Sequence, residues 1–148
     1  MSDLHGGCAL CQSTGGVLVA TGLHWRVIRA EDPAFPAFYR VVWAEHVAEF
    51  SSLPVAARVE CMNVVCAVEQ VLLRVLHPTK VNLAALGNVV PHLHWHVIAR
   101  FDWDSHFPQP IWGKSQRHVE SVAALLAVTL PDLDREVALA LGDLTSEG

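Results

Sequence analysis

The chain has 148 residues, a net charge of −5 at pH 7 and a pI near 5.9. Its hydrophobic fraction of 52% and charged fraction of 17% favour one packed domain over a disordered chain. The sequence has no basic patch large enough to predict binding to a nucleic acid polymer, and no apolar run long enough to cross a bilayer. Because no basic-then-apolar leader begins the chain, we expect a cytoplasmic protein with its four cysteines as thiols or metal ligands.

Alternating and β-branched segments predict five strands, the first two forming a hairpin around Gly22. A long helix is expected between the third and fourth strands, because residues 55–76 contain no Gly or Pro and repeat apolar side chains at helical spacing. Ser51 or Ser52 is expected to cap this helix, and Pro78 to end it. The predicted strands are residues 16–22, 24–30, 39–44, 80–86 and 92–101.

Two shorter helices are expected near the C-terminus, over residues 115–130 and 132–141. Cys61 and Cys66 lie within the long helix and are interpreted as small core side chains. This order of elements predicts an α+β fold, with helices packed on an antiparallel sheet of about five strands.

The most informative segment is the last predicted strand, where His92, His94 and His96 alternate with apolar residues. Side chains of a strand alternate between faces, so the three imidazoles share one face while Leu93, Trp95, Val97 and Phe101 share the other. Three imidazoles beside a Gly-Asn turn indicate a functional face rather than a merely soluble one.

Three chemistries fit this face, and the spacing does not choose among them. The imidazoles could bind a metal ion, or their N–H groups could bind phosphate. Alternatively, one imidazole could be a nucleophile toward phosphorus while the others hold the phosphoryl group, because neutral imidazole is populated near pH 7.

The run His92-Leu93-His94-Trp95-His96-Val97-Ile98 resembles the motif of the histidine-triad (HIT) family at every position. The resemblance extends from about residue 8 to residue 113. It includes the segment 82–91, Asn-Leu-Ala-Ala-Leu-Gly-Asn-Val-Val-Pro, which is similar to the bacterial branch of the family. We therefore expect one HIT domain over residues 1–148, with a core at about 8–113 and a helical C-terminal extension at 114–148.

The resemblance implies a nucleotide hydrolase or transferase in which His94 attacks the α-phosphate and forms a nucleotidyl-histidine. The expected substrate is a dinucleoside polyphosphate or a nucleoside phosphoramidate. His96 would hydrogen-bond the phosphate or the leaving group. The expected substrate-binding groups are the amide of Asn82 for phosphate, the amide of Asn88 and the backbone N–H near Val90 for the developing charge, and Asp32 for the ribose hydroxyls.

A second site is indicated by Cys8-Ala9-Leu10-Cys11, whose spacing lets two thiolates bind one metal ion. From spacing alone, the other two ligands are any of nine histidines. The resemblance implies a structural Zn²⁺ held by Cys8, Cys11, His46 and His92, with His92 thereby removed from the phosphate chemistry.

Two positions depart from the family pattern: Phe38 stands where many members have an extra histidine, and Val89 where many have a serine or threonine. These departures keep two alternatives open. One is a nucleotide-binding regulator with little turnover, and the other is a zinc hydrolase that holds its metal on His92, His94 and His96.

The resemblance also implies a homodimer formed through the long helix and the neighbouring strand. The stripe of Met62, Val65 and Val68 fits either that interface or the core. In the segment after the last strand, four side chains could stack on a base, close a partner's pocket or cover the core. They are Trp103, His106, Phe107 and Trp112.

Overall fold

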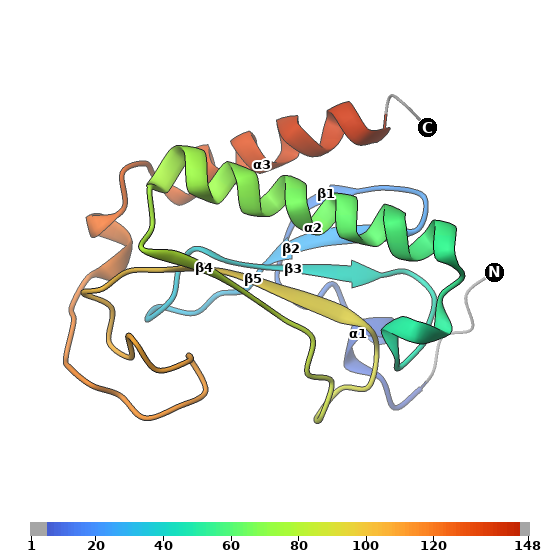
Figure 1. The fold of residues 1–148 in the computed structure, drawn as a ribbon, viewed down its shortest axis with the longest axis horizontal. Coiled ribbons are helices and arrows are strands. Elements are labelled where there is room, and N and C mark those ends of the chain that lie inside the picture. Colours follow the sequence, from blue (N-terminus) through green and yellow to red (C-terminus); the bar gives the residue numbers. More distant parts are fainter. Residues whose placement is uncertain (1–5, 146–148) are drawn as a thin grey trace.

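The computed structural model describes residues 6–145, which form one twisted sheet with two long helices on one face (Figure 1). The strands are antiparallel and lie in the order β1-β2-β3-β5-β4. Their bounds are β1 Val17–Thr21, β2 Trp25–Arg29, β3 Phe38–Trp43, β4 Lys80–Ala84 and β5 His94–Arg100. The predicted α+β class, the hairpin and the five strands are confirmed.

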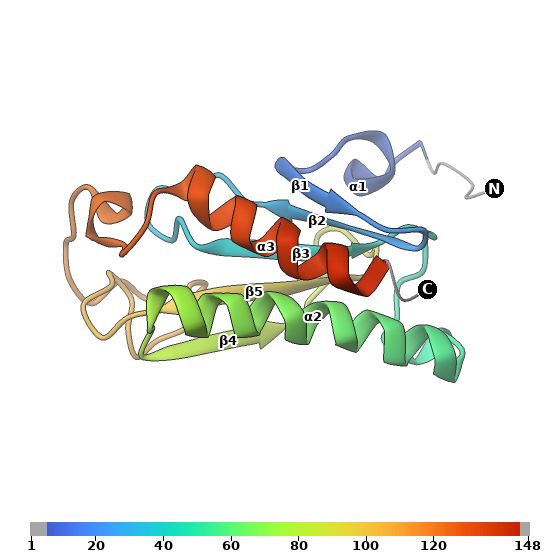
Figure 2. The ribbon, with the colours of Figure 1, turned by 90° about the horizontal axis from the view of Figure 1, so that it is seen from above.

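The helices are α1 (Ala9–Gln12), α2 (Val55–Leu76) and α3 (Leu130–Thr145), with short 3₁₀ turns at Phe50–Ser52 and Val122–Leu125. Figure 2 shows α2 and α3 side by side over the sheet, with α2 above β4 and β5. No helix within residues 6–145 is long and apolar enough to span a membrane.

The main core lies between the sheet and these two helices. Alternate strand residues such as Val27, Val41 and Val97 face the helices and are fully buried. The predicted apolar face of the last strand is confirmed, because Leu93 and Val97 belong to this core while Trp95 and Phe101 pack against it.

Helix α2 buries one stripe of side chains at helical spacing. Val65 and Val68 of the predicted stripe are buried in the core, so of the three only Met62 lies part-way to the surface. Cys61 is buried as expected, but Cys66 is exposed, because it follows Val65 on the opposite side of the helix. The expectation that Cys66 is a core residue is therefore wrong.

The ends of α2 follow from backbone geometry. His77 adopts a left-handed conformation with φ of 49° and Pro78 follows, so the helix ends at Leu76. The predicted serine cap is wrong: Ser51 and Ser52 lie in a 3₁₀ turn, and Pro54 occupies the cap position with no side-chain hydrogen bond.

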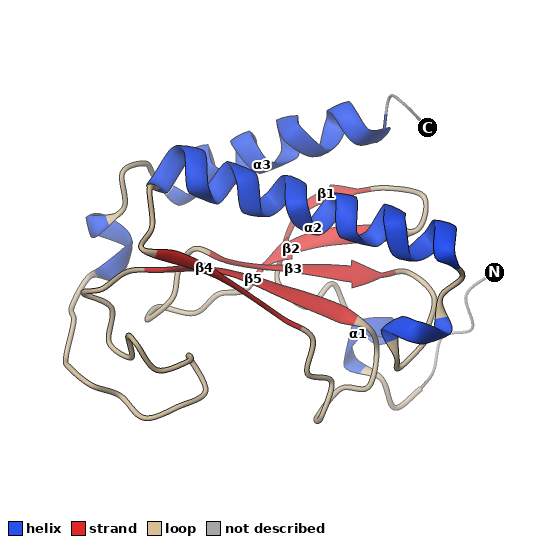
Figure 3. Ribbon diagram, viewed as in Figure 1, coloured by secondary structure: helices blue, strands red, loops and turns tan. Residues whose placement is uncertain are grey.

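The predicted helix over residues 115–130 is also wrong. Figure 3 shows a long loop between β5 and α3, interrupted by one short helical turn at Val122–Leu125. The side chain of Arg117 hydrogen-bonds the carbonyls of Asp104 and Phe107, and the backbone of Gln116 bonds Ser105, so this segment is tied to the preceding loop. Ser121 has a left-handed backbone, which an α-helix does not accommodate. The last helix, predicted over 132–141, is confirmed and runs from Leu130 to Thr145.

Helix α3 is fixed to the sheet by Asp134, which is partly buried. Its carboxylate accepts hydrogen bonds from Nε of Arg29 at 2.9 Å and from the hydroxyl of Tyr39 at 2.6 Å. Leu133, Val137 and Leu141 of the same helix enter the main core. The helix therefore contributes both apolar and charged contacts to the domain.

Replacing Asp134 with Ala should lower the free energy of unfolding by about 2 kcal/mol, because Arg29 and Tyr39 lose a shared, partly buried partner. Urea unfolding measures the change. Glu136→Ala on the same helix is the matched control, since its ion pair with Arg74 is exposed and should be worth less than about 0.5 kcal/mol. Equal losses in the two variants would contradict this assignment.

Candidate active site and metal centre

The sheet face opposite the helices carries the histidines. His94 and His96 project from β5 beside β3, where His94 lies opposite Val42 and His96 lies opposite Arg40. Their ring centroids are 4.9 Å apart. Figure 1 shows what flanks this face: α1 on one side and the loop that follows β5 on the other.

The protonation of His94 is set by a backbone carbonyl. Nδ1 of His94 lies 2.6 Å from the carbonyl oxygen of His92, which can only accept, so Nδ1 carries the proton. In the neutral ring Nε2 then holds a free lone pair. Within the described residues Nε2 has no hydrogen bond and is not among the buried, unpartnered atoms, so it is open to solvent. Burial lowers the pKa of His94, the bond to His92 opposes this, and the charge of Arg40 lowers it further.

His96 is buried, and its ring lies between three other rings: Phe38 at 5.4 Å, Trp112 at 5.1 Å and His94. Burial lowers its pKa to about 4, with help from the neighbouring His94 and Arg40. Its Nδ1 is buried without a hydrogen-bond partner, whereas Nε2 is not. A proton on Nδ1 would be a buried donor without an acceptor, so the neutral ring carries its proton on Nε2. The ring therefore presents an N–H group to the site.

His92 precedes β5 and turns away from this pair toward the N-terminal segment. Its Nε2 donates to the carbonyl of Trp43 at 2.6 Å, which leaves the lone pair on Nδ1. That Nδ1 lies 3.5 Å from Sγ of Cys8, 3.4 Å from Sγ of Cys11 and 3.3 Å from Nδ1 of His46. The four predicted ligand atoms lie within 4.8 Å of one another.

These residues fit a tetrahedral metal ion. Zinc–nitrogen bonds of about 2.0 Å and zinc–sulfur bonds of about 2.3 Å place neighbouring tetrahedral ligand atoms roughly 3.3 to 3.6 Å apart. The distances to Nδ1 of His92 match these separations. The Trp43 carbonyl orients the ring as an outer partner of a metal-bound imidazole does. The grouping of His92 with the cysteines also disfavours one metal on all three histidines of the motif.

The N-terminal segment is held on the sheet by Arg26 of β2. Its guanidinium donates to the carbonyls of Leu10, Ser13 and Thr14. Cys8 and Leu10 pack against Ile28 and Val42, with Val90 at the edge of the same cluster. The cysteine pair therefore reaches the histidines through both packing and hydrogen bonds.

The turn before β5 contains four residues singled out in the sequence. Gly87 has φ of 69°, Asn88 is exposed and Val89 is 92% exposed. The side chain of Val90 packs beside the cysteines. The substrate contacts expected of Asn88 and of the backbone near Val90 stay predictions.

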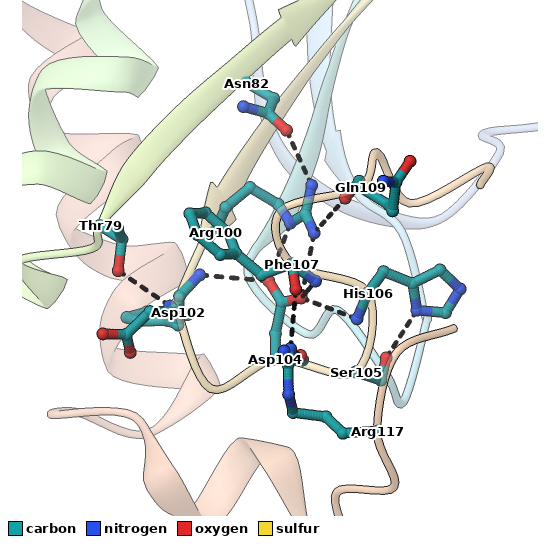
Figure 4. Close-up of polar contacts among 11 residues, drawn as sticks. Thr79, Asn82, Arg100, Asp102, Asp104, Ser105, His106, Phe107, Gln109 and Arg117 are labelled. Atoms are coloured by element: carbon teal, nitrogen blue, oxygen red, sulfur yellow. Dashed lines mark hydrogen bonds and ion pairs between the residues drawn. The ribbon is translucent and has the colours of Figure 1, made fainter. Parts of the chain in front are cut away.

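Asn82 lies on the histidine face of the sheet, and its Oδ1 accepts a hydrogen bond from Nη1 of Arg100 at 2.9 Å. Sequence reasoning missed Arg100, which is 1% exposed. Its alternation with His96 and Ile98 was the available signal. Figure 4 shows that its guanidinium also binds Asp104 and the carbonyl of Gln109.

Asp104 holds the loop after β5. It accepts hydrogen bonds from the backbone N–H groups of Phe101, His106 and Phe107 as well as from Arg100 (Figure 4). Burial alone would raise the pKa of Asp104, but these donors hold it below its usual value. The loop so fixed delivers Trp112 to the ring of His96.

The other side chains singled out in this loop have different contacts. His106 bonds the hydroxyl of Ser105 at 2.8 Å and packs its ring against Phe35. Trp103 stacks on Phe101. Of the four, Trp112 is the one in ring contact with the histidine pair.

Asp32 lies in the loop between β2 and β3, where Oδ1 accepts the N–H of Ala34 at 3.0 Å. Asp32 lines a cavity that this loop forms with residues of the 119–130 segment. None of the triad histidines lines that cavity. The expected contact of Asp32 with ribose stays a prediction.

The family model for the HIT domain matches residues 16–103, which is more than half of the chain. The chain belongs to the HIT family. Cys8, Cys11 and α3 lie outside the residues matched in this HIT chain. No curated protein matches this chain.

Solved HIT structures share the fold. A histidine triad protein from Bradyrhizobium japonicum is 25% identical with a TM-score of 0.69, over 92% of this chain and 98% of that one. One from Marinobacter aquaeolei is 24% identical with a TM-score of 0.68, over 99% and 98% of the two chains. A Zn-bound histidine triad family protein from Mycobacterium smegmatis is 16% identical with a TM-score of 0.62, over 96% and 98%.

The surroundings of His96 predict its titration. By NMR, its ring should titrate near pH 4 and remain neutral at pH 6. Since an unfolded histidine binds a proton near pH 6.5, the stabilisation from neutral His96 is complete above that pH and is lost as pH falls toward 4. His96→Gln should therefore lose less stability between pH 7 and pH 5 than the unmodified protein. A midpoint near 6.5 would show that the ring is not enclosed as described.

Proposed function

We propose that this protein cleaves nucleoside phosphate derivatives through a nucleotidyl-histidine on His94. HIT family membership supports a nucleotide-binding or hydrolase-type function in general terms. The observation that carries the specific proposal is the hydrogen bond from Nδ1 of His94 to the carbonyl of His92, because it directs the lone pair of Nε2 to the open face.

In the first step the lone pair of Nε2 attacks the α-phosphorus, and the bond from phosphorus to the leaving group breaks with its electron pair on the leaving group. In the second step a water oxygen attacks the same phosphorus, the bond to His94 breaks, and the nucleoside monophosphate is released. Water loses a proton to solvent in this step, and His94 returns to its neutral form. Another nucleophile in place of water makes the reaction a transfer.

The remaining residues hold the phosphate and the nucleoside. The N–H on Nε2 of His96 donates to a phosphate oxygen, and the ring that carries it is held in place by its burial among neighbouring rings. Asn82 is oriented by Arg100 and presents its amide to the phosphate. We assign the amide of Asn88 and the backbone N–H of Val90 to the developing charge, and Asp32 to the ribose.

Turnover of diadenosine tetraphosphate and of adenosine 5′-phosphoramidate tests the proposal. His94→Gln should lower AMP release from whichever substrate is cleaved by about 10³-fold or more, because the nucleophile is lost. His24→Gln is the control, since His24 pairs with Glu60 away from the site. AMP release that His94→Gln leaves intact would contradict the proposal, whereas AMP binding without release would support the regulatory alternative.

We also propose that the metal at Cys8, Cys11, His46 and His92 is Zn²⁺ and that it is structural. The donor set of two thiolates and two imidazoles is typical of closed zinc sites, which leave no position for an activated water. The metal would tie the N-terminal segment to the residue that orients His94.

Metal analysis of protein purified without added zinc should find about one zinc ion per chain, and Cys8→Ser should lose most of it with a lower Tm. Cys66→Ser is the matched control, because Cys66 is exposed on α2 and should keep both metal and Tm. The same zinc content in Cys8→Ser and Cys66→Ser would refute the site. Chelation of the metal should lower the Tm, whereas the rate of AMP release by the protein that remains folded should change little.

A homodimer is proposed on the exposed side of α2 and the unpaired edge of β4. Val55, Val59 and Leu73 of α2 and Leu83 of β4 are exposed apolar side chains in this region. Val55, Val59 and Met62 line a groove beside Phe50. A second copy of the chain would bury these side chains and cover the edge strand.

A further inference from the structure

Arg40 is one of two arginines among residues 6–145 whose guanidinium has no hydrogen bond or ion pair. Six of the eight arginines bind a carboxylate or a backbone carbonyl. The exceptions are Arg40 and Arg58, and each has a buried Nε without a partner. The terminal nitrogens of Arg40 are not among the buried unpartnered atoms, so they are open to solvent.

Arg40 lies in the middle of the histidine face. Its backbone pairs with that of His96 across β3 and β5, and its guanidinium carbon lies 4.9 Å from the ring centroid of Phe38. Phe38 is in turn in ring contact with His96. An arginine stacked on an aromatic ring keeps its edge N–H groups free to bind an anion.

This guanidinium is the fixed positive charge beside the two rings. Burial lowers the pKa of His96, and the charges of His94 and Arg40 lower it further. Burial lowers the pKa of Arg40 itself, and Asp32 is the acid whose charge opposes that effect. A half-buried cation without a salt bridge is costly, and a bound anion would relieve that cost.

The surroundings of the site also favour one kind of leaving group. An amine must gain a proton when its bond to phosphorus breaks, whereas a phosphate can leave as an anion. A neutral His96 together with a cationic Arg40 suits charge stabilisation rather than proton donation.

We propose that Arg40 binds the phosphate chain beyond the α-phosphate and thereby selects nucleoside polyphosphates over nucleoside phosphoramidates. This inference rests on the proposed function of His94 and names the substrate class of the same site. As His94 attacks, the bond from the α-phosphorus to the bridging oxygen breaks, and the electron pair remains on that oxygen. Arg40 stabilises this negative charge and transfers no proton.

The test compares kcat/KM for diadenosine tetraphosphate and adenosine 5′-phosphoramidate. Arg40→Gln should lower the value for the polyphosphate by about 10²-fold and leave that for the phosphoramidate within about threefold. Arg40→Lys should restore part of the loss, because it keeps the charge without the forked geometry. Arg135→Gln is the control, since Arg135 lies on α3 on the helical side and its ion pair with Asp132 is exposed. Equal losses on both substrates, or no loss on the polyphosphate, would overturn the assignment.

Equilibrium binding of nucleotides tests the role of Arg40 without depending on turnover. The unmodified protein should bind ADP more tightly than AMP, and Arg40→Gln should remove that preference while retaining AMP affinity and an unchanged circular dichroism spectrum. A preference for ADP that persists in Arg40→Gln, or that is absent from the unmodified protein, would overturn the role of Arg40. Since binding needs no nucleophile, this result stands apart from any failure of His94 to form an adduct.

Discussion

Two backbone carbonyls fix different tautomers in two histidines of one short segment, and the site depends on this constraint. The Trp43 carbonyl takes the Nε2 proton of His92, whose Nδ1 lone pair then faces Cys8, Cys11 and His46. The His92 carbonyl takes the Nδ1 proton of His94, whose Nε2 lone pair then faces the open side of the sheet. The two imidazoles therefore have their lone pairs on different nitrogens, which suits the first as a metal ligand and the second as a nucleophile. A shift of His92 would disturb both, because its carbonyl and its ring act at the same time.

The surroundings of the pair show why one face of the sheet is available for chemistry. Helices α2 and α3 cover the other face and bury its apolar residues, which leaves the histidine face to be bordered by shorter segments. Arg26 fixes the N-terminal segment at one border, and the buried pair of Arg100 and Asp104 fixes the loop at the other. Each border brings functional side chains to the centre: the cysteines on one side and Trp112 on the other. Buried polar groups with complete hydrogen bonding give such loops a defined shape.

Turn residues and periodicity predicted the hairpin and the long helix, because local alternation and helical spacing record which side is buried. Alternation also predicted one strand face for His92, His94 and His96, but only His94 and His96 lie on β5, whereas His92 precedes the strand and its ring reaches Cys8 and Cys11. Periodicity failed for residues 115–130, where Arg117 and Gln116 bond to the preceding loop rather than to their own helical neighbours. The metal ligands come from three distant parts of the chain, so spacing gave the cysteine pair and only the family resemblance selected His46 and His92. Arg40 and Arg100 were missed for a related reason. A sequence does not show which arginine has a carboxylate opposite it and which has none.

The most direct test of the central constraint is the tautomer of His94, measured by nitrogen-15 NMR of imidazole-labelled protein at neutral pH. The account predicts a protonated Nδ1 and an unprotonated, metal-free Nε2 for this ring, with the opposite arrangement for His92, whose Nε2 is protonated and whose Nδ1 is metal-bound. A proton on Nε2 of His94, or a metal ion bound there, would contradict the account, because the lone pair that must reach phosphorus would already be occupied.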